Sequence, residues 1–154
     1  MVENLVIRKL EKGEEFPYDL LLLADPSMEA IEDYIHRGDC YIALLDNKVV
    51  GEYVLIKTRP FTIELVNIAV DEKYQGKGIG KALVMDAINR ARESKAKVIE
   101  VGTGNCSAYQ HLLYQKCGFR MTWIDIDFFK KHYDEEIYEN GVRCIDMIRM
   151  SMDL

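Results

Sequence analysis

The chain has 154 residues, of which 49% are apolar and 30% charged, a composition typical of one globular domain. No segment approaches the ~20 apolar residues of a membrane-spanning helix, and the N-terminus lacks the basic start and apolar run of a secretory signal. The net charge of −6 argues against nucleic-acid binding, which depends on a basic surface. We therefore expect a cytoplasmic protein with a single domain over residues 1–154, which binds neither nucleic acid nor a membrane.

The first half of the chain predicts four strands and one helical segment. The helical segment runs from residue 17 to about residue 37, with an interruption at Asp25-Pro26, after which Ser27 is suited to cap a second helix. A tight turn, DNK, joins the second and third strands. The four strands are predicted at residues 5–10, 40–46, 49–57 and 62–70.

The second half predicts two helices and three strands, and with the first half it indicates one mixed α/β domain. A helix is predicted over residues 78–93, and a shorter one over residues 107–116 ends at Gly118, a favourable C-terminal cap. A long loop with Asn140-Gly141 near its end separates the last two strands. The strands are predicted at residues 97–104, 120–128 and 143–152.

The cysteines are widely spaced and form no C-x-x-C pair, and zinc sites usually need closely spaced ligands. We therefore expect no metal, and we expect free thiols, as in other proteins of reducing compartments. The four residues concerned are Cys40, Cys106, Cys117 and Cys144.

A glycine-rich segment, YQGKGIGKA at residues 74–82, lies between a predicted strand and the next helix. Two familiar phosphate-binding patterns do not fit it. The P-loop pattern G-x-x-x-x-G-K-[ST] would need a glycine at Gln75 and a hydroxyl at Ala82. The dinucleotide-binding pattern G-x-G-x-x-G would need its third glycine at Lys81.

The pattern that remains, Gln75-x-x-Gly78-x-Gly80, is typical of a turn that an anion can approach closely. Glycines leave the main chain accessible, while the free amides and the dipole of the helix N-terminus favour negative charge. Lys77 and Lys81 add positive charge. The turn suits a pyrophosphate bound without metal, although a bare strand-to-helix turn would use the same glycines.

Two motifs within residues 62–120 resemble those of the GNAT superfamily of N-acetyltransferases. NIAVDEKYQGKGIGKAL matches the acyl-CoA-binding signature [QR]-x-x-G-x-[GA] after a strand, and NCSAYQHLLYQKCGF matches the N…A…LYxKxGF segment one strand later. The resemblance implies an acetyltransferase that moves an acetyl group from acetyl-CoA to a primary amine by direct attack. It also implies a GNAT-like α/β fold, of the mixed α+β kind. Its mostly antiparallel sheet of six to seven strands, flanked by about four helices, is splayed between the fourth and fifth strands.

The resemblance assigns the acetyl-CoA site to the fourth strand and the glycine turn. A bulge in this family usually splays the fourth strand from the fifth, and the acyl group enters the gap. Because a bulge frees amides from the ladder, an amide near Val70 is expected to stabilise charge on the thioester oxygen. The pyrophosphate is expected on Gln75, Gly76, Lys77, Gly78, Ile79, Gly80 and Lys81, and the pantetheine arm along Ile68, Ala69 and Val70.

Tyr114 matches the family's general acid, which protonates the leaving thiolate beside the cofactor. Helical spacing places it with Gln110 and His111, opposite an apolar side that contains Ala108 and Leu112. A tyrosine that merely bridges the core and water is the alternative.

Three neighbouring residues have competing interpretations. Asn105 matches a position that reaches the pantetheine or holds the splayed strand end, and plain helix capping is the alternative. His111 is expected to face solvent rather than to act in catalysis. Cys106 is not expected to carry the acyl group, because this family normally transfers it directly.

Glu64 and Glu100 are the candidate general bases, because each is a carboxylate within an otherwise apolar strand. Alternation places Glu64 on one face with Val66, Ile68 and Val70. Burial would raise the pKa of each carboxyl toward the useful range. Both residues also suit structural roles, and a reaction without a general base stays open.

The acceptor is expected to be a cationic amine, such as a polyamine, an aminoglycoside-like compound or a peptide amine. The loop at residues 125–141 carries six acidic side chains, and the first helical segment is also acidic. An ordinary solvated acidic surface explains the same residues. Two alternatives to an enzyme are a non-catalytic acyl-CoA sensor and an interaction domain. Relatives often pair, and Phe128, Phe129 and Tyr133 are candidates for a homodimer interface.

Overall fold

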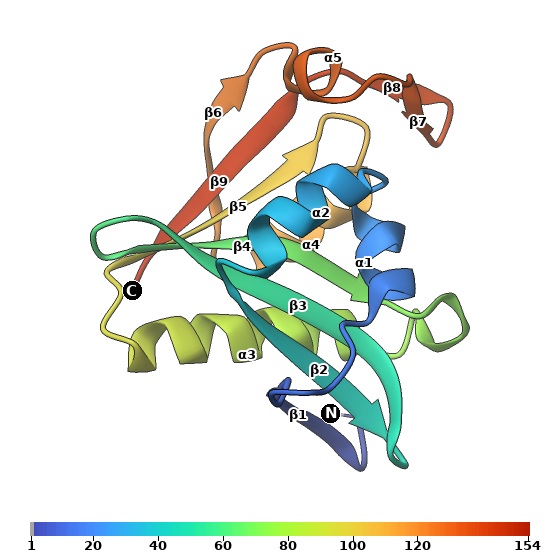
Figure 1. Cartoon of the computed structure of the whole chain (residues 1–154). Helices are drawn as coiled ribbons and strands as arrows, with labels where there is room; N and C mark the ends of the chain where they lie inside the picture. Colours follow the sequence, from blue (N-terminus) through green and yellow to red (C-terminus); the bar gives the residue numbers. More distant parts are fainter. Residues whose placement is uncertain (1) are drawn as a thin grey trace.

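The computed structural model describes residues 2–154. In these residues a seven-stranded sheet has the order β1-β2-β3-β4-β5-β9-β6, and β7 and β8 form a separate two-stranded ribbon (Figure 1). The strands are β1 (Leu5–Lys9), β2 (Asp39–Leu45), β3 (Lys48–Arg59), β4 (Thr62–Val70), β5 (Val98–Gly104), β6 (Arg120–Asp125), β7 (Ile137–Glu139), β8 (Val142–Cys144) and β9 (Met147–Asp153). The helices are α1 (Tyr18–Ala24), α2 (Met28–Ile35), the 3-10 turn η1 (Glu72–Tyr74), α3 (Ile79–Glu93), α4 (Ala108–Lys116) and α5 (Phe128–His132).

The predicted α/β fold is confirmed. The β4–β5 pair is parallel and the other sheet pairs are antiparallel, which gives the expected mixed sheet. Within residues 2–154 there are five α-helices rather than about four, because the short α5 lies in the segment expected to be a loop. None of these helices is long and apolar enough to cross a membrane.

The local signals in the first half of the chain were interpreted correctly. The chain leaves the helical path at Asp25, and the Ser27 hydroxyl caps α2 by accepting a hydrogen bond from the Ala30 amide at 3.1 Å. Asp46 and Asn47 both have positive φ, 48° and 64°, which is the conformation of a two-residue hairpin turn. This turn joins β2 to β3.

The last two predicted strands were too long. The strand expected to reach residue 128 ends at Asp125, because Asp127 adopts a left-handed conformation with φ of 61° and is the N-cap of α5. The strand predicted at 143–152 is divided between β8 and β9. The amides of Ile145 and Asp146 donate to the Asn105 side chain at 2.7 and 3.0 Å, so the chain leaves the ladder at this point.

Each face of the sheet is covered by its own helices and has its own core. On one face, α3 and α4 pack over a large apolar cluster that includes Leu83, Ile88 and Tyr114. On the other face, α1 and α2 cover a smaller cluster that includes Leu21, Ile31 and Val54. The glycine turn thus enters α3 on one face, while the Asp25 break between α1 and α2 lies on the other.

A bulge in β4 separates its two halves and opens the sheet. Val54 of β3 pairs with Asn67 and the next residue, Leu55, pairs with Leu65, so Val66 is an extra residue in β4. The parallel pairing of β4 with β5 is confined to Thr62–Leu65 and Val98–Val101 among the described residues. Beyond this point the two strands diverge, as Figure 1 shows, and the predicted splay is confirmed.

Candidate active site

Two cavities meet beside the splayed strands. The first, which we name the turn cavity, has a volume of about 610 Å³ and lies between the end of β4, the glycine turn and α4. The second, the gap cavity, has a volume of about 470 Å³ and lies between β4, β5, the α1–α2 connection, α5 and the β7–β8 ribbon. The residues that line both cavities are Leu23, Ala24, Ile68, Gln110, Tyr114 and Glu139.

The glycine turn has the geometry of an anion-binding helix N-terminus. Gly76 and Gly78 have φ of 78° and 88°, which other residues adopt only with strain. Gly78 is the N-cap of α3, so no side chain caps the first-turn amides of this helix, and those amides are available to an anion. The Gln75 side chain closes the turn by donating to the Val70 carbonyl at 3.0 Å.

The other turn residues have different surroundings. Lys81 and Gly80 line the turn cavity. The Lys77 ammonium instead lies 5.4 Å from the centre of the Tyr74 ring. Ile79 is buried in the core below α3, so it offers the cavity its main chain rather than its side chain.

The end of β4 forms one wall of the turn cavity. Ile68, Ala69 and Val70, the residues predicted for the pantetheine arm, line this cavity. These residues lie beyond the last β4–β5 pair of the described chain, so one edge of β4 is free here. The set of donors, which combines main-chain amides and the Lys81 ammonium, fits a pyrophosphate.

Tyr114 lies where the two cavities meet, although it is only 3% exposed. Its ring packs edge-on against Phe119. The Tyr114 hydroxyl forms no hydrogen bond with the residues that the structure describes. Burial raises the pKa of Tyr114 above its ordinary value, so the hydroxyl stays protonated at neutral pH. A protonated hydroxyl next to both cavities is what a proton donor requires.

The orientation predicted for α4 was wrong. Leu112, expected on the apolar side, is 51% exposed, whereas Tyr114, expected on the polar side, is buried. The helix turns its Leu113 and Tyr114 face toward the sheet and the start of α3, where Leu113 packs against the core. This orientation brings Tyr114 to the cavities.

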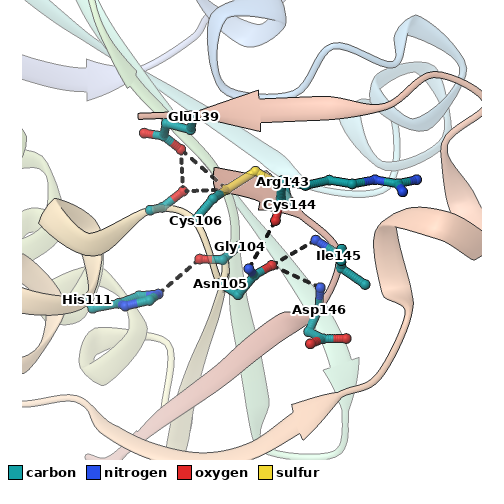
Figure 2. Close-up of a disulfide and its surroundings, with 10 residues drawn as sticks. Gly104, Asn105, Cys106, His111, Glu139, Arg143, Cys144, Ile145 and Asp146 are labelled. Carbon is teal, nitrogen blue, oxygen red and sulfur yellow. Dashed lines mark hydrogen bonds between the residues drawn. A yellow bond between two sulfur atoms is a disulfide. The ribbon is translucent and has the colours of Figure 1, made fainter. Parts of the chain in front are cut away.

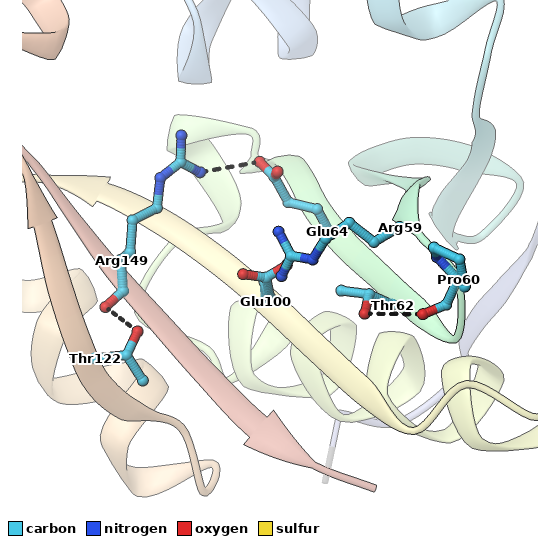
Figure 3. A network of polar contacts seen from close by, with 7 residues as sticks. All are labelled: Arg59, Pro60, Thr62, Glu64, Glu100, Thr122 and Arg149. Carbon is cyan, nitrogen blue, oxygen red and sulfur yellow. Dashed lines mark hydrogen bonds and ion pairs between the residues drawn. The ribbon is translucent and has the colours of Figure 1, made fainter.

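Glu64 and Glu100 are neighbours across the parallel β4–β5 pair, as Figure 3 shows, and each is held by an arginine. Glu100 accepts from Arg59 at 2.8 Å, and Glu64 lies 3.4 Å from Arg149. Burial raises the pKa of Glu64, while the Arg149 charge opposes the rise. Neither carboxylate is among the described residues that line the two cavities.

The face predicted for Glu64 also needs correction. Val66 packs against the α1–α2 core, whereas Ile68 and Val70 pack against the α3 core. The extra residue at Val66 reverses the alternation, so Glu64 does not share a face with Ile68 and Val70. Strict alternation along β4 therefore assigns Glu64 to the same face as Ile68 and Val70, which is wrong.

Asn105 and His111 hold the end of β5. The Asn105 side chain donates to the Arg143 carbonyl at 3.1 Å and accepts from the Ile145 and Asp146 amides (Figure 2). Helix capping, the alternative role for Asn105, is therefore wrong. His111 does not simply face solvent, because its Nε2 lies 2.9 Å from the Gly104 carbonyl oxygen.

Cys106 and Cys144 form a disulfide, so the expectation of four free thiols was wrong (Figure 2). Cys40 and Cys117 are free. The bond joins the start of α4 to the β7–β8 ribbon. Cys106, Cys144 and Glu139 each place one ligand atom within 4.8 Å of the others. Because the sulfur atoms are bonded to each other, they offer no thiolate to a metal.

The sequence interpretation missed two polar side chains of the site. Asn67, 3% exposed, donates through Nδ2 to the Leu21 carbonyl and the Tyr34 hydroxyl, and its Oδ1 has no partner among the described residues. Glu139 lines both cavities and accepts from the Ser107 hydroxyl at 2.6 Å. An isolated polar residue at a strand bulge was the signal for Asn67, and the Asn140-Gly141 turn was the signal for the ribbon that carries Glu139.

The chain belongs to the GNAT family of acetyltransferases, whose family model matches residues 7–119. The uncharacterized N-acetyltransferase YvbK of Bacillus subtilis is 54% identical over 154 residues, which cover 98% of this chain and 99% of YvbK.

Two solved structures are also similar over nearly their full length. A GNAT acetyltransferase of Elizabethkingia anophelis with acetyl-CoA bound has a TM-score of 0.98 and 47% identity, covering 99% of this chain and 100% of that one. An acetyltransferase of Bacillus subtilis in complex with CoA has a TM-score of 0.92 and 55% identity, covering 97% and 99% of the two chains. The chain is thus an N-acetyltransferase with acetyl-CoA as co-substrate.

Proposed function

We propose that the protein transfers the acetyl group to a primary amine by direct attack within a ternary complex. The observation that carries this proposal is that Tyr114 lines both cavities. The turn cavity would hold the pyrophosphate and pantetheine, and the gap cavity would hold the amine. The two substrates then meet at Tyr114, so that proximity accounts for much of the acceleration.

Acetyl-CoA, when bound, supplies an activated acetyl thioester. Gly76, Gly78 and Lys81 hold its pyrophosphate, while the free edge of β4 from Ile68 to Val70 aligns the arm that carries the thioester. The Tyr114 hydroxyl donates its proton to the departing sulfur, because burial keeps this hydroxyl protonated.

The acceptor that suits the gap cavity is a small cationic amine or a peptide amine. Among the described residues that line this cavity, the charged ones are Asp25 and Glu139, both carboxylates. Asp25 accepts hydrogen bonds from the Tyr34 and Tyr133 hydroxyls and from the Ser27 amide. Carboxylates in a partly enclosed cavity attract a cation and repel an anionic acceptor.

We also propose that residues 1–154 act as one catalytic domain. The family model ends at residue 119, but β9 pairs with β5 inside the same sheet, and the ribbon supplies part of both cavities. The region after the matched segment is therefore expected to be necessary for turnover.

The decisive experiment measures thiol release from acetyl-CoA in the presence of a panel of cationic, neutral and anionic amines. We expect release with cationic primary amines, and a fall in kcat of about 10²-fold or more in Tyr114→Phe. The affinity for acetyl-CoA, measured by calorimetry, should be unchanged in that variant.

Tyr18→Phe is the matched control, because Tyr18 is also a tyrosine on a helix but lines neither cavity. Binding of acetyl-CoA without release from any amine would instead support a sensor. Full turnover by Tyr114→Phe would remove Tyr114 as the proton donor, and turnover of anionic amines alone would contradict the cationic acceptor.

A further inference from the structure

The proposed reaction needs a group that accepts a proton from the amine, and the two predicted candidates lie away from the cavities. Glu64 and Glu100 are bound by Arg149 and Arg59. A primary amine resembles lysine, whose pKa is about 10.4, so it is mostly protonated and unable to attack at neutral pH. A group that acts as the base therefore has to lie among the residues where the cavities join.

Glu139 is the carboxylate that lines both cavities, as Tyr114 does. One oxygen, Oε2, is fixed by the Ser107 hydroxyl at 2.6 Å and lies 3.7 Å from the Cys106 sulfur. The other oxygen, Oε1, forms no hydrogen bond with the described residues and is free to meet a ligand. The side chain is thus anchored through one oxygen and available through the other.

The ribbon that carries Glu139 is fixed to the rest of the site by covalent and polar bonds. Figure 2 shows the Cys106–Cys144 disulfide beside Glu139, and Asn105 bonded to the chain that follows Cys144. In the ribbon Glu139 pairs with Val142, next to the pair that Tyr138 forms with Arg143. Ser107 and Cys106 directly precede α4, so the same element positions both Tyr114 and Glu139.

We propose that Glu139 is the general base of this enzyme, and this inference rests on the proposed amine acetylation. Glu139 Oε1 takes a proton from the substrate ammonium, which breaks an N–H bond and frees the nitrogen lone pair. The nitrogen forms a bond to the acetyl carbon, the C–S bond breaks, and the sulfur takes the Tyr114 proton. The new amide nitrogen returns its extra proton to the Tyr114 oxygen through solvent, and Glu139 releases its own to bulk water.

The groups around Glu139 are compatible with this role. From the other elements that line the gap cavity, Asp25, Tyr133 and Tyr114 face the same space, and Lys81 lies in the turn cavity. On the ribbon itself Arg143 is paired with Glu136 at 3.3 Å, so its charge is directed to a different carboxylate. In the gap cavity, Asp25 adds negative charge that favours a substrate cation.

The experiment compares pH profiles of kcat/KM for Glu139→Gln and the wild type, with the best amine from the panel. Glutamine keeps the size of the side chain and can accept from Ser107, but it is not a base. We expect a fall of about 10²-fold at pH 7. The deficit should shrink as the pH rises towards the amine's own pKa, because solvent then deprotonates the substrate.

Glu135→Gln is the control, because Glu135 is an exposed carboxylate of the same segment. The proposal is overturned if Glu139→Gln keeps the wild-type profile, or if its deficit is equal at every pH, which indicates a merely structural role. A Glu100→Gln variant that loses activity at pH 7 and recovers it at high pH would assign the base to Glu100 instead.

Failure of this inference can be distinguished from failure of the proposed function. A wild-type enzyme that acetylates no amine would count against the proposed function itself. An active wild type with an equally active Glu139→Gln variant would count only against this inference.

Discussion

Glu52 is a carboxylate buried completely in β3, and neither of its oxygens has a hydrogen-bond partner among the described residues. It lies beside Ile42 of β2 and Ala69 of β4. Burial raises the pKa of Glu52 well above its ordinary value of 4.5. The side chain is therefore expected to be neutral in the folded protein over a pH range in which it is charged in the unfolded chain.

This difference predicts how stability depends on pH. Because the folded pKa is raised, the contribution of Glu52 to stability is fully present below the unfolded pKa and is lost as pH rises through the folded pKa. Glu52→Gln removes this loss. We expect its Tm, relative to that of the wild type, to increase steadily from pH 4 to pH 8 in thermal denaturation followed by circular dichroism.

An exposed carboxylate provides the comparison for Glu52. Glu93→Gln, at the end of α3, replaces an exposed side chain, so its Tm relative to the wild type should change less between pH 4 and pH 8 than that of Glu52→Gln. A constant Tm difference between Glu52→Gln and the wild type would show that Glu52 has the same pKa in both states. The burial argument would then be wrong.

At the scale of elements, the Cys106–Cys144 disulfide closes a loop between residues 38 positions apart. In the chain-entropy model, a cross-link of this span stabilises the folded state by roughly 3–4 kcal/mol. For a domain of this size, that free energy corresponds to a fall in Tm of roughly 6–16 °C on reduction. The ribbon should also loosen, so KM for the amine should rise while the affinity for acetyl-CoA changes little.

Reductant titrations test this prediction. Cys144→Ser should reproduce the reduced wild type and should not respond to reductant. Cys117→Ser, which removes a free thiol, should respond as the wild type does. An unchanged Tm and KM after complete reduction, measured by thiol titration, would mean that the hydrogen bonds of Asn105 and Ser107 hold the ribbon without the disulfide.

The elements also show what a single sequence can and cannot predict. The glycine turn was predictable because its demands are local: Gly76 and Gly78 need positive φ, and the helix that follows begins at a recognisable residue. The face of the sheet on which Glu64 lies was not predictable. One extra residue at Val66 reverses the alternation, and the residues of this bulge have no distinctive composition. The disulfide depends on the path of the chain between its cysteines, which spacing does not give.

The β7–β8 ribbon lies between these two cases. Asn140 and Gly141 have φ of 53° and 76°, so this dipeptide forms a two-residue hairpin turn, a strong local signal. What the signal could not give is the position of the ribbon over the gap cavity, which depends on the contacts of Asn105 and Cys106. The sequence alone therefore could not identify Glu139 as the candidate base, whereas a local motif identified Tyr114 as the candidate acid.

At the scale of the whole molecule, the β6 edge of the sheet exposes apolar side chains, and we propose that a second copy covers them. β6 pairs with β9 on one side and is the last strand of the sheet. Met121, Trp123 and Ile124 are 51%, 53% and 50% exposed, on a strand whose outer edge is unpaired in the described chain. The three aromatic residues predicted at a homodimer interface, Phe128, Phe129 and Tyr133, are half-buried, and Phe129 and Tyr133 line the gap cavity instead.

Unpaired strand edges with apolar side chains favour association, because a partner strand satisfies the edge amides and carbonyls and buries the side chains together. We therefore expect a homodimer that pairs through β6. Light scattering during size exclusion should give twice the chain mass of 17.8 kDa. Trp123→Lys should give the single-chain mass, since a charge at the centre of the strand would have to be desolvated.

Val6→Lys is the control, because Val6 is equally exposed but lies on β1, at the opposite edge of the sheet from β6. This variant should leave the dimer intact. A single-chain mass for the wild type at every concentration tested would contradict the β6 dimer, and loss of the dimer in Val6→Lys alone would assign the interface to β1.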